Sequence, residues 1–514
     1  MKILIPFNPD AQQFSYKNEA LYHALRDSMI EGKLTYGTKL PSSREAASTY
    51  GVSRGLVTQV YEMLMSEGFV EAVPGKGTYV AYRSGPGKTP SISNNKVELS
   101  VWGSKLAEAI REPVKAHAGD AGAPVGASLQ ETGAAPAERI EFELAGADAA
   151  AFPRQAWNRC LHEQVRSSDY TSRPLQDPLG DPALRAAVSL HLRRSRSIDA
   201  DPDRIAIVNG SMQAIALTMQ LLVNPGDPVI VESPGYGGAR RAAAAVGGVP
   251  VDAVIDEQGI VPQPWEARLL FVTPGRQFPT GVQLPLARRQ ELLRWAGKRG
   301  GIIIEDDYDT EFRYAGRPIE PLKALDREDR VVFIGTFSRT MYDGLRLGYV
   351  VLPHWLAEPF RVAKKLYEPH PAALLEQRAL AAFMNSGSYE RHLRRMQRIY
   401  GAKAAQLRLE LEPLSAAFEW LPNEAGIHIF GWWKGAPSDY AAFMAECGRR
   451  GVIWRDAAPY LGNGSGAAAC LGFSHLSAAE ISRGTALMAE VLRNFYEQKG
   501  TPEGISSKLC YDEK

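Results

Sequence analysis

Residues that could bind a phosphate group follow two apolar segments in the second half of the chain. A Gly-Ser turn that opens a helix can hold a phosphate through its backbone N–H groups and the helix dipole. A serine hydroxyl can donate to a phosphate oxygen, and an arginine can bind two oxygens at once. The candidate residues for these roles are Gly210, Ser211, Met212, Ser338 and Arg346. Many strand-helix turns look alike, so the turn alone is a weak signal.

Three other residues could bind an aromatic ring. Tyr236 follows a Pro-Gly pair and could stack on the ring, although packing is the more frequent role of a single tyrosine. Asp306 ends an apolar segment, and a buried carboxylate needs a cationic partner or several donors. A protonated pyridine nitrogen is one such partner, and a nearby arginine is the other. Tyr308 could hydrogen-bond to a ring hydroxyl.

Short apolar segments precede these residues and must position them. The pattern predicts strands at 204–208, 228–231, 269–272, 301–304 and 331–334. Helical segments separate the strands, which is typical of a mostly parallel sheet. Ligands bind at the carboxyl ends of the strands in such sheets. We therefore expect the candidate residues to lie together at one edge of the sheet.

The start of the chain predicts a different kind of structure. Ser42 or Ser43 can cap one short helix, and Ser53 can cap the next. Two short helices joined by a tight turn that contains glycine form a helix-turn-helix. Residues 69–73 and 77–81 flank a Pro-Gly-Lys-Gly turn, which indicates a β-hairpin wing.

The second of these helices has a polar N-terminal half, the half that enters a major groove in helix-turn-helix proteins. Side chains there, at the start of the preceding helix and at the wing tip could contact DNA. The candidates are Ser43, Arg44, Ser53, Arg54, Thr58 and Lys76. Residues 1–83 hold nine Lys and Arg against eight Asp and Glu, so the contact surface would be small. A helical domain that binds another protein is the alternative.

Composition bounds the remaining possibilities. The chain has 514 residues, with 59 Lys and Arg and 58 Asp and Glu, and 45% of the residues are hydrophobic. These values exclude a wholly disordered or a strongly basic protein. The four cysteines form no C-x-x-C pair, so we expect neither a disulfide framework nor a metal site. No apolar run reaches the roughly 18 residues of a membrane span, and we expect a cytoplasmic protein with no membrane partner.

Composition also changes along the chain. Residues 83–139 are rich in Gly, Pro, Ser and Ala, which is typical of a linker, and they contain one short amphipathic stretch. We therefore predict four parts. They are a DNA-binding domain at 1–82, a flexible linker with a short helix at 83–139, a large domain at 140–498 and a tail at 499–514.

The chain resembles the MocR/GabR subfamily of GntR regulators across almost its full length. The string LPSSRE…GVSR…GKGTYV resembles the winged-helix domain of the GntR superfamily. The strings VESPGY, TPGRQFPTG, IEDDYDTEFRY and GLRLGY resemble fold-type-I aminotransferases, which use pyridoxal phosphate. The resemblance implies an α/β fold, with an N-terminal winged helix-turn-helix and a large aspartate-aminotransferase-like domain that has a mostly parallel sheet.

The subfamily's properties imply a function. Its large domain is a sensor that binds pyridoxal phosphate, often with an amino compound, and its members regulate transcription as dimers on operator DNA. The resemblance thus implies double-stranded DNA, a small-molecule effector and a second copy of the chain as partners. The residues that match the cofactor site are Gly210, Ser211, Met212, Tyr236, Asp306, Tyr308, Thr336, Ser338, Arg339 and Arg346.

The sequence departs from the family at the position that does the chemistry. The family string T-F-S-K-T carries the lysine that forms a Schiff base with pyridoxal phosphate, and Arg339 stands in its place. A guanidinium stays protonated, so it can neither form the imine nor act as the base. Three lysines in this part of the chain do not match the motif, namely Lys323, Lys364 and Lys365. We therefore predict no catalytic residue and no transamination.

Three further positions differ. Leu175 stands where the family has a phosphate-binding tyrosine, and Arg276 stands where it has a histidine. The arginine that binds a substrate carboxylate in relatives would fall near Ala469 and Cys470, and the sequence has none there.

Two interpretations of the large domain stay open. Pyridoxal phosphate could bind noncovalently, or the pocket could hold another ligand, with Arg339 and Arg276 gripping an anion. For the whole chain we predict a DNA-binding transcriptional regulator that senses pyridoxal phosphate, a small amino or anionic ligand, or both. The alternative is a pyridoxal-phosphate-dependent aminotransferase-type enzyme with an N-terminal helix-turn-helix. A scaffold with neither activity is a third hypothesis, against which the polar helix face argues.

Overall fold

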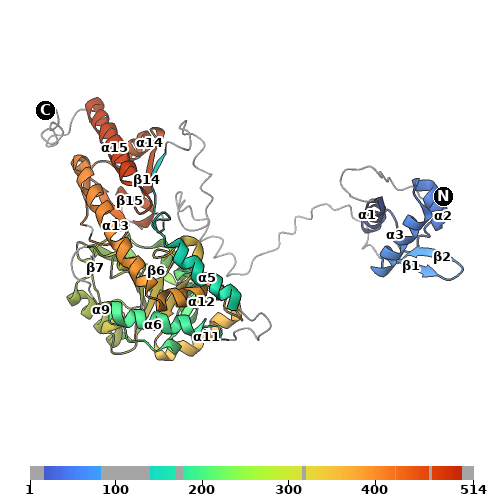
Figure 1. Cartoon of the computed structure of the whole chain (residues 1–514), viewed down its shortest axis with the longest axis horizontal. Coiled ribbons are helices and arrows are strands. Elements are labelled where there is room, and N and C mark those ends of the chain that lie inside the picture. The colour runs from blue at the N-terminus through green and yellow to red at the C-terminus, as the bar shows by residue number, and fades with distance from the viewer. Residues whose placement is uncertain are drawn as a thin grey trace. The chain divides into compact units, whose positions relative to one another are not determined.

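The computed structural model describes residues 17–82, 139–144, 146–167, 177–314, 320–422, 424–461 and 466–499. These residues fall into two compact units, which are described separately (Figure 1). The linker predicted at 83–139 and the tail predicted at 499–514 lie outside the described residues, except for Arg139 and Lys499. Leu175 also lies outside them.

The N-terminal unit is a winged helix-turn-helix. Its elements are α1 (Lys17–Ile30), α2 (Ser43–Tyr50), α3 (Arg54–Ser66), β1 (Val70–Val73) and β2 (Gly77–Val80). Ser42, rather than Ser43, caps α2, because its hydroxyl accepts the Glu45 N–H at 3.3 Å while the Glu45 carboxylate accepts the Ser42 N–H at 2.9 Å. Ser53 caps α3. The predicted helices, caps and hairpin are therefore confirmed.

One apolar core holds this unit together. Val57, Val60 and Leu64 lie on the inner face of α3 at helical spacing and are fully buried against α1. β1 and β2 pair antiparallel, with Val73 opposite Gly77. Because the core uses one face of α3, the opposite face stays exposed to solvent.

The larger unit is built on an eight-stranded sheet. The order of its strands is β4 (Ile205–Val208), β11 (Gly348–Val351), β10 (Val331–Thr336), β9 (Ile302–Asp307), β8 (Leu269–Val272), β5 (Pro228–Ser233), β6 (Val249–Asp256) and β7 (Gly259–Ile260). β11 and β7 run antiparallel to their neighbours, and the other described pairs are parallel. The predicted mostly parallel sheet and α/β fold are confirmed.

A second, five-stranded sheet follows in the chain. Its order is β12 (Phe418–Trp420), β13 (His428–Trp433), β15 (Ala468–Gly472), β14 (Val452–Asp456) and β3 (Ile140–Phe142). The helices of the unit are α5 (Arg154–Ser167), α6 (Pro182–Arg196), α7 (Ser211–Leu222), α8 (Gly237–Ala245), α9 (Leu286–Arg299), α10 (Leu322–Leu325), α11 (His354–Tyr367), α12 (Leu374–Asn385), α13 (Ser388–Glu410), α14 (Pro437–Arg449) and α15 (Ala478–Lys499).

Both faces of the large sheet are buried. Along β9, Ile302 and Ile304 pack with α7 and α8 on one face, while Ile303 packs with α9 on the other. This alternation explains why the strands read as continuous apolar runs in the sequence. With both faces covered, the loops at the carboxyl ends of the strands are where a ligand can reach the sheet.

Candidate functional site

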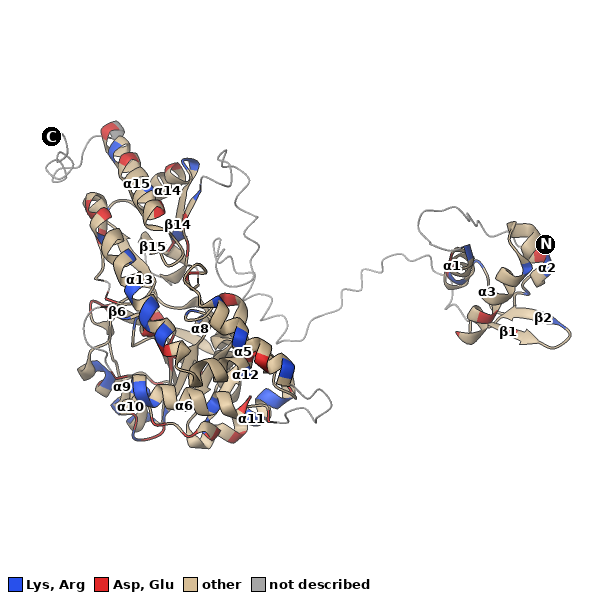
Figure 2. Cartoon of the chain, in the orientation of Figure 1, with Lys and Arg blue, Asp and Glu red and all other residues tan. Residues whose placement is uncertain are grey.

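A groove of about 910 Å³ runs between α2, α3 and the hairpin tip of the N-terminal unit. Ser43, Thr58 and Lys76 line this groove. Arg54, at the start of α3, is exposed and donates to the Ser43 hydroxyl at 3.4 Å. The structure thus brings four predicted DNA contacts, from three elements, to one face of the unit. Lysine and arginine share the unit with acidic residues (Figure 2).

The other two predicted contacts are exposed as well, and one basic residue of the groove was not among the predicted contacts. Arg44 and Ser53 are exposed, although the Ser53 hydroxyl already caps α3. Lys39 also lines the groove, with its Nζ 5.9 Å from the centre of the Tyr79 ring. Lys39 directly precedes the LPSSRE string, and this position could have identified it from the sequence.

The predicted phosphate residues meet where β4 ends and β11 begins. Gly210 has a φ of +87°, which favours glycine, and it precedes Ser211 and Met212 at the start of α7. A Cβ at Gly210 would lie 2.7 Å from Nη2 of Arg346, so the arginine lies directly against this turn. Among the described residues no side chain caps α7, which leaves its first turn open to an anion.

Two of the predicted cofactor residues each carry a buried polar atom that has no hydrogen-bond partner among the described residues. These atoms are Oδ1 of Asp306, at the end of β9, and Oγ of Ser338, after β10. The Ser338 N–H donates to the Thr336 hydroxyl at 3.2 Å, which fixes the backbone of this loop. Burial, with smaller contributions from Asp307 and Asp309, raises the pKa of Asp306 to about 7. Such atoms are costly unless a ligand pairs with them.

Aromatic side chains connect three of the strand-end loops. Tyr236, after β5, packs edge-on against Phe278 with ring centres 6.0 Å apart, and Phe278 packs edge-on against Tyr308 at 5.7 Å. Tyr460 also contacts Phe278, at 4.9 Å. Burial raises the pKa of Tyr308 well above 10, so its hydroxyl keeps a proton to donate. Sequence reasoning found the two flanking tyrosines but neither Phe278 nor Tyr460.

Arg276 belongs to a buried network of the protein itself. Its Nη1 donates to the Tyr308 hydroxyl at 3.0 Å and to the Asp309 carboxylate at 3.0 Å, and its Nη2 donates to the His428 carbonyl at 2.8 Å. Burial and Arg276 hold the pKa of His428 well below 6.5, so the imidazole is neutral. Arg276 therefore positions Tyr308 and neutralises Asp309, and the geometry argues against its gripping a ligand anion.

Arg339 follows Ser338 in the loop after β10 and is half-buried. Its Nη1 donates to the Leu144 carbonyl at 3.2 Å, and its positive charge opposes the rise in the pKa of Asp306 that burial causes. Two of the lysines that do not match the motif are held elsewhere. Nζ of Lys364 pairs with Glu368 at 2.8 Å, and Nζ of Lys323 donates to the Val331 carbonyl at 2.8 Å.

An arginine on the neighbouring strand faces the position where the family's carboxylate-binding arginine is missing. Arg455 on β14 is the register partner of Cys470 on β15. It pairs with Glu143 at 2.9 Å and donates to the Tyr460 hydroxyl at 3.4 Å. Burial raises the pKa of the Cys470 thiol to about 12, and the charges of Arg276, Arg455 and Arg339 oppose that rise. The sequence search missed Arg455 because it examined only one strand.

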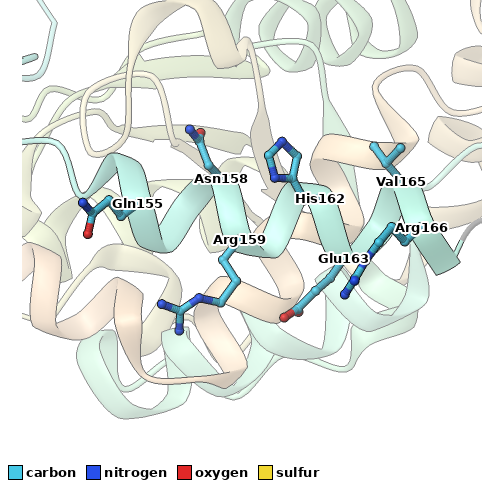
Figure 3. A pocket seen from close by; sticks show the side chains of 7 residues that line it. All are labelled: Gln155, Asn158, Arg159, His162, Glu163, Val165 and Arg166. Carbon is cyan, nitrogen blue, oxygen red and sulfur yellow. The ribbon is translucent and has the colours of Figure 1, made fainter.

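A hollow on α5 gives no comparable site. A hollow of about 660 Å³ is lined by residues of α5 alone, and Figure 3 shows their side chains pointing to opposite sides of that helix. Within the described residues no cluster of three His, Cys, Asp or Glu side chains could hold a metal ion. No helix in the same part of the chain is long and apolar enough to cross a membrane.

Fold and geometry together define a winged helix-turn-helix joined to an aminotransferase-type unit, and two family models match the chain accordingly. The family described as "Bacterial regulatory proteins, gntR family" matches residues 17–80. The family described as "Aminotransferase class I and II" matches residues 153–463. The chain belongs to the MocR-type GntR regulators, which combine these two domains.

Individual relatives agree with this assignment. The chain is 32% identical over 441 residues to the probable rhizopine catabolism regulatory protein MocR of Rhizobium meliloti, covering 84% of each chain. It is 30% identical to the pyridoxine biosynthesis transcriptional regulator PdxR of Corynebacterium glutamicum, covering 74% of this chain and 75% of the relative. Among solved structures, an archaeal alanine:glyoxylate aminotransferase superposes with a TM-score of 0.65 at 25% identity, covering 76% of this chain and 96% of that one.

Proposed function

We propose that the protein is a DNA-binding transcriptional regulator whose aminotransferase-like unit senses a small ligand without transamination. The exposed face of the N-terminal unit carries this proposal. Arg54 and Thr58 are exposed on α3, and Lys76 is exposed on the wing, while the apolar side of α3 is fully buried. A helix that only packs against its own domain does not need polar and basic side chains on its exposed face. A helix that enters a major groove uses such side chains to contact bases and phosphates.

A homodimer is part of the proposal. Helix-turn-helix dimers read two half-sites about 34–36 Å apart, so a second copy supplies the second contact. One N-terminal unit is nearly neutral and offers few basic side chains, so a single copy would bind weakly. The MocR and PdxR relatives are themselves named as regulators, which supports the DNA-binding role.

The pocket fits pyridoxal phosphate held without a covalent bond. Asp306 offers an unpartnered carboxylate oxygen for a ring nitrogen, and Ser338 offers an unpartnered hydroxyl for a phosphate oxygen. The turn at Gly210 with Arg346 beside it suits the remaining phosphate oxygens. Tyr236 lies where it could stack on a ring. When bound, pyridoxal phosphate supplies an aldehyde and an electron-withdrawing ring.

The side chain at the usual lysine position supports a site without covalent chemistry. Transamination needs a primary amine twice, as the point of attachment and as the base. Arg339 supplies neither, because its guanidinium does not lose a proton. Its charge instead suits a carboxylate or phosphate of an effector. Arg455 is a second cation, opposite Cys470 and paired with Glu143. We therefore assign the pocket a small amino or anionic effector, with pyridoxal phosphate or in its place.

Retardation of a DNA fragment that contains the promoter of the protein's own gene tests the regulatory role. We expect the full-length protein to bind the fragment and the Arg54→Ala variant to lose binding. Arg26→Ala is the matched control, because Arg26 lies on α1 and pairs with Asp27. Failure to bind that promoter or any promoter of a neighbouring gene would overturn the proposal.

The enzyme alternative makes the opposite prediction. An active aminotransferase would convert an amine donor to a keto product when incubated with pyridoxal phosphate. Arg339 predicts that no keto product forms. We also expect Arg339→Lys to keep the fold, because the arginine's described hydrogen bond ends on the Leu144 carbonyl, which an ammonium can also reach.

A further inference from the structure

Four arginines form an exposed ridge on α13. Arg391, Arg394, Arg395 and Arg398 lie within eight residues that include no Asp or Glu. Their spacings of three and four residues place them on one helix face, and all four are exposed. Figure 2 shows the basic stretch along the middle of α13. We call these four residues the arginine ridge.

The ridge arginines have no anionic partner among the described residues, whereas several other arginines of the unit are paired with carboxylates. Arg185 and Arg196 on α6, for example, each contact two carboxylates. Arg391 donates only to the Ser386 carbonyl and the Ser388 hydroxyl, and the other three ridge residues have no hydrogen bond or ion pair with the described residues. Like charges at this spacing destabilise a helix. The cost has no compensation within the described residues, so an external anion would offset it.

A groove of about 780 Å³ runs beside the ridge. Tyr314 closes one end, where a Cβ at Gly401 would lie 2.9 Å from the tyrosine Cβ, and Nε2 of Gln397 donates to the Glu311 carbonyl at 2.7 Å. Two carboxylates lie nearby, and neither contacts a ridge arginine. Glu424 pairs with Arg313 at 2.7 Å, and Glu390 lies 3.9 Å from His191. The unpaired charges that line this groove are therefore positive.

We propose that the arginine ridge binds the phosphodiester backbone of the DNA that flanks the operator. A guanidinium fork matches a phosphate, and the ridge spans about 10 Å of helix, enough for two or three phosphates. The same chain carries the winged helix, so DNA held there is at high effective concentration for the ridge. This inference rests on the proposed regulatory function.

An acidic protein fits the ridge less well. Protein interfaces have an apolar centre inside a polar rim. The apolar residues of this stretch, Leu393 and Met396, point inward and are buried, so the ridge presents charge without an apolar anchor. A phosphate backbone requires only charge and hydrogen-bond donors.

Two DNA fragments of the same promoter test the inference with the full-length protein. One is trimmed to the segment that the protein protects from nuclease, and the other keeps the flanking DNA. The ridge variant is the triple substitution Arg394→Gln, Arg395→Gln and Arg398→Gln. On the longer fragment we expect about 10-fold weaker binding and a salt dependence, log K against log salt, that is shallower by about 2 to 3. On the trimmed fragment the variant should equal wild type.

Two further variants serve as controls. Changing the same three ridge residues to lysine keeps their charge and should keep the salt dependence close to wild type. Changing Arg268, Arg483 and Arg493 to glutamine removes three exposed arginines outside the ridge and should leave both fragments bound as before.

The outcomes separate the two proposals. If the ridge variant kept the wild-type salt dependence on the longer fragment, the proposed binding of flanking DNA would be wrong. An equal loss of affinity for both fragments would also contradict it. If the variant keeps DNA binding but loses binding to polyglutamate, the ridge takes an acidic protein and the DNA inference is wrong. If wild type binds neither fragment, the regulatory function itself fails.

Discussion

The two units hold their charged side chains in opposite ways. On the recognition face of the N-terminal unit, Arg44, Arg54 and Lys76 are exposed and form no ion pair with the described residues. In the core of the larger unit, Arg196 and Arg276 are buried against carboxylates, each at 3.0 Å. The first arrangement leaves charge available for an external polyanion, and the second uses charge to shape a pocket.

The difference shows which charges are available for binding and which are needed for the stability of the fold. Exposed charges contribute little to folding, so they can be chosen for a partner. A buried ion pair must be satisfied on every side, because removing one partner leaves an uncompensated charge. Substitutions of the exposed charges in the first unit should therefore change binding alone, and substitutions of the buried charges in the second should change stability.

The largest expected effect is on Arg276. Arg276→Met would leave the buried Asp309 carboxylate without its partner, and we expect a loss of about 3–5 kcal/mol in the free energy of unfolding. Denaturant unfolding of the larger unit measures this loss. Arg299→Met is the control, because its pair with Glu266 at 3.5 Å is exposed and should contribute under about 1 kcal/mol. Equal effects of the two substitutions would remove the contrast between buried and exposed charges.

Asp306 gives the next largest effect, and here the substitution should raise the free energy of unfolding instead of lowering it. Burial raises its folded pKa to about 7, against 3.8 for an unperturbed carboxyl. The folded state therefore holds the proton more tightly, and this group's contribution to stability falls as the pH rises from about 4 to about 7. Asp306→Asn removes that penalty, so the ligand-free variant should be more stable than wild type by up to about 4 kcal/mol above about pH 7.

Thermal unfolding across that pH range measures the difference for Asp306→Asn, which should shrink toward zero near pH 4. The same variant should bind pyridoxal phosphate more weakly, since an amide cannot neutralise a ring cation. A variant less stable than wild type at neutral pH would show that the unpartnered carboxylate oxygen belongs to the fold and not to a ligand.

Much of the fold followed from local patterns. Capping serines and the Pro-Gly-Lys-Gly turn predicted the winged helix, and five apolar runs predicted five strands to within a few residues. The ligand site was harder to predict from the sequence, because its remaining residues come together only through strand register. Arg455 faces Cys470 across two consecutive strands whose register the sequence does not specify. Arg276 was an anion-binding residue in one of the two open interpretations, because nothing in the sequence pairs it with Asp309.

A smaller effect is expected at the groove of the N-terminal unit. Lys39→Ala removes a basic side chain from the groove without touching the core, so promoter binding should weaken by about 10-fold or less. The salt dependence of log K should become shallower by about 1 if the lysine contacts a phosphate. Thermal unfolding should not change. A loss of stability with unchanged DNA binding would instead assign Lys39 to packing on the Tyr79 ring.

The smallest expected effect is at the cap of α2. Ser42→Ala removes the side-chain half of the capping box with Glu45, which should lower the free energy of unfolding by about 1 kcal/mol. Chemical denaturation followed by circular dichroism measures it. Ser66→Ala, at the last residue of α3, is the control and should have a smaller effect.

The central claim is that the aminotransferase-like unit binds its ligand without covalent chemistry. The most direct test is the absorption spectrum of the full-length protein with and without added pyridoxal phosphate, followed by borohydride reduction and intact-mass analysis. We predict that the cofactor binds and that reduction adds no mass to the chain. A mass increase that maps to a lysine would contradict the role given to Arg339, and an unchanged spectrum would contradict noncovalent binding of this cofactor.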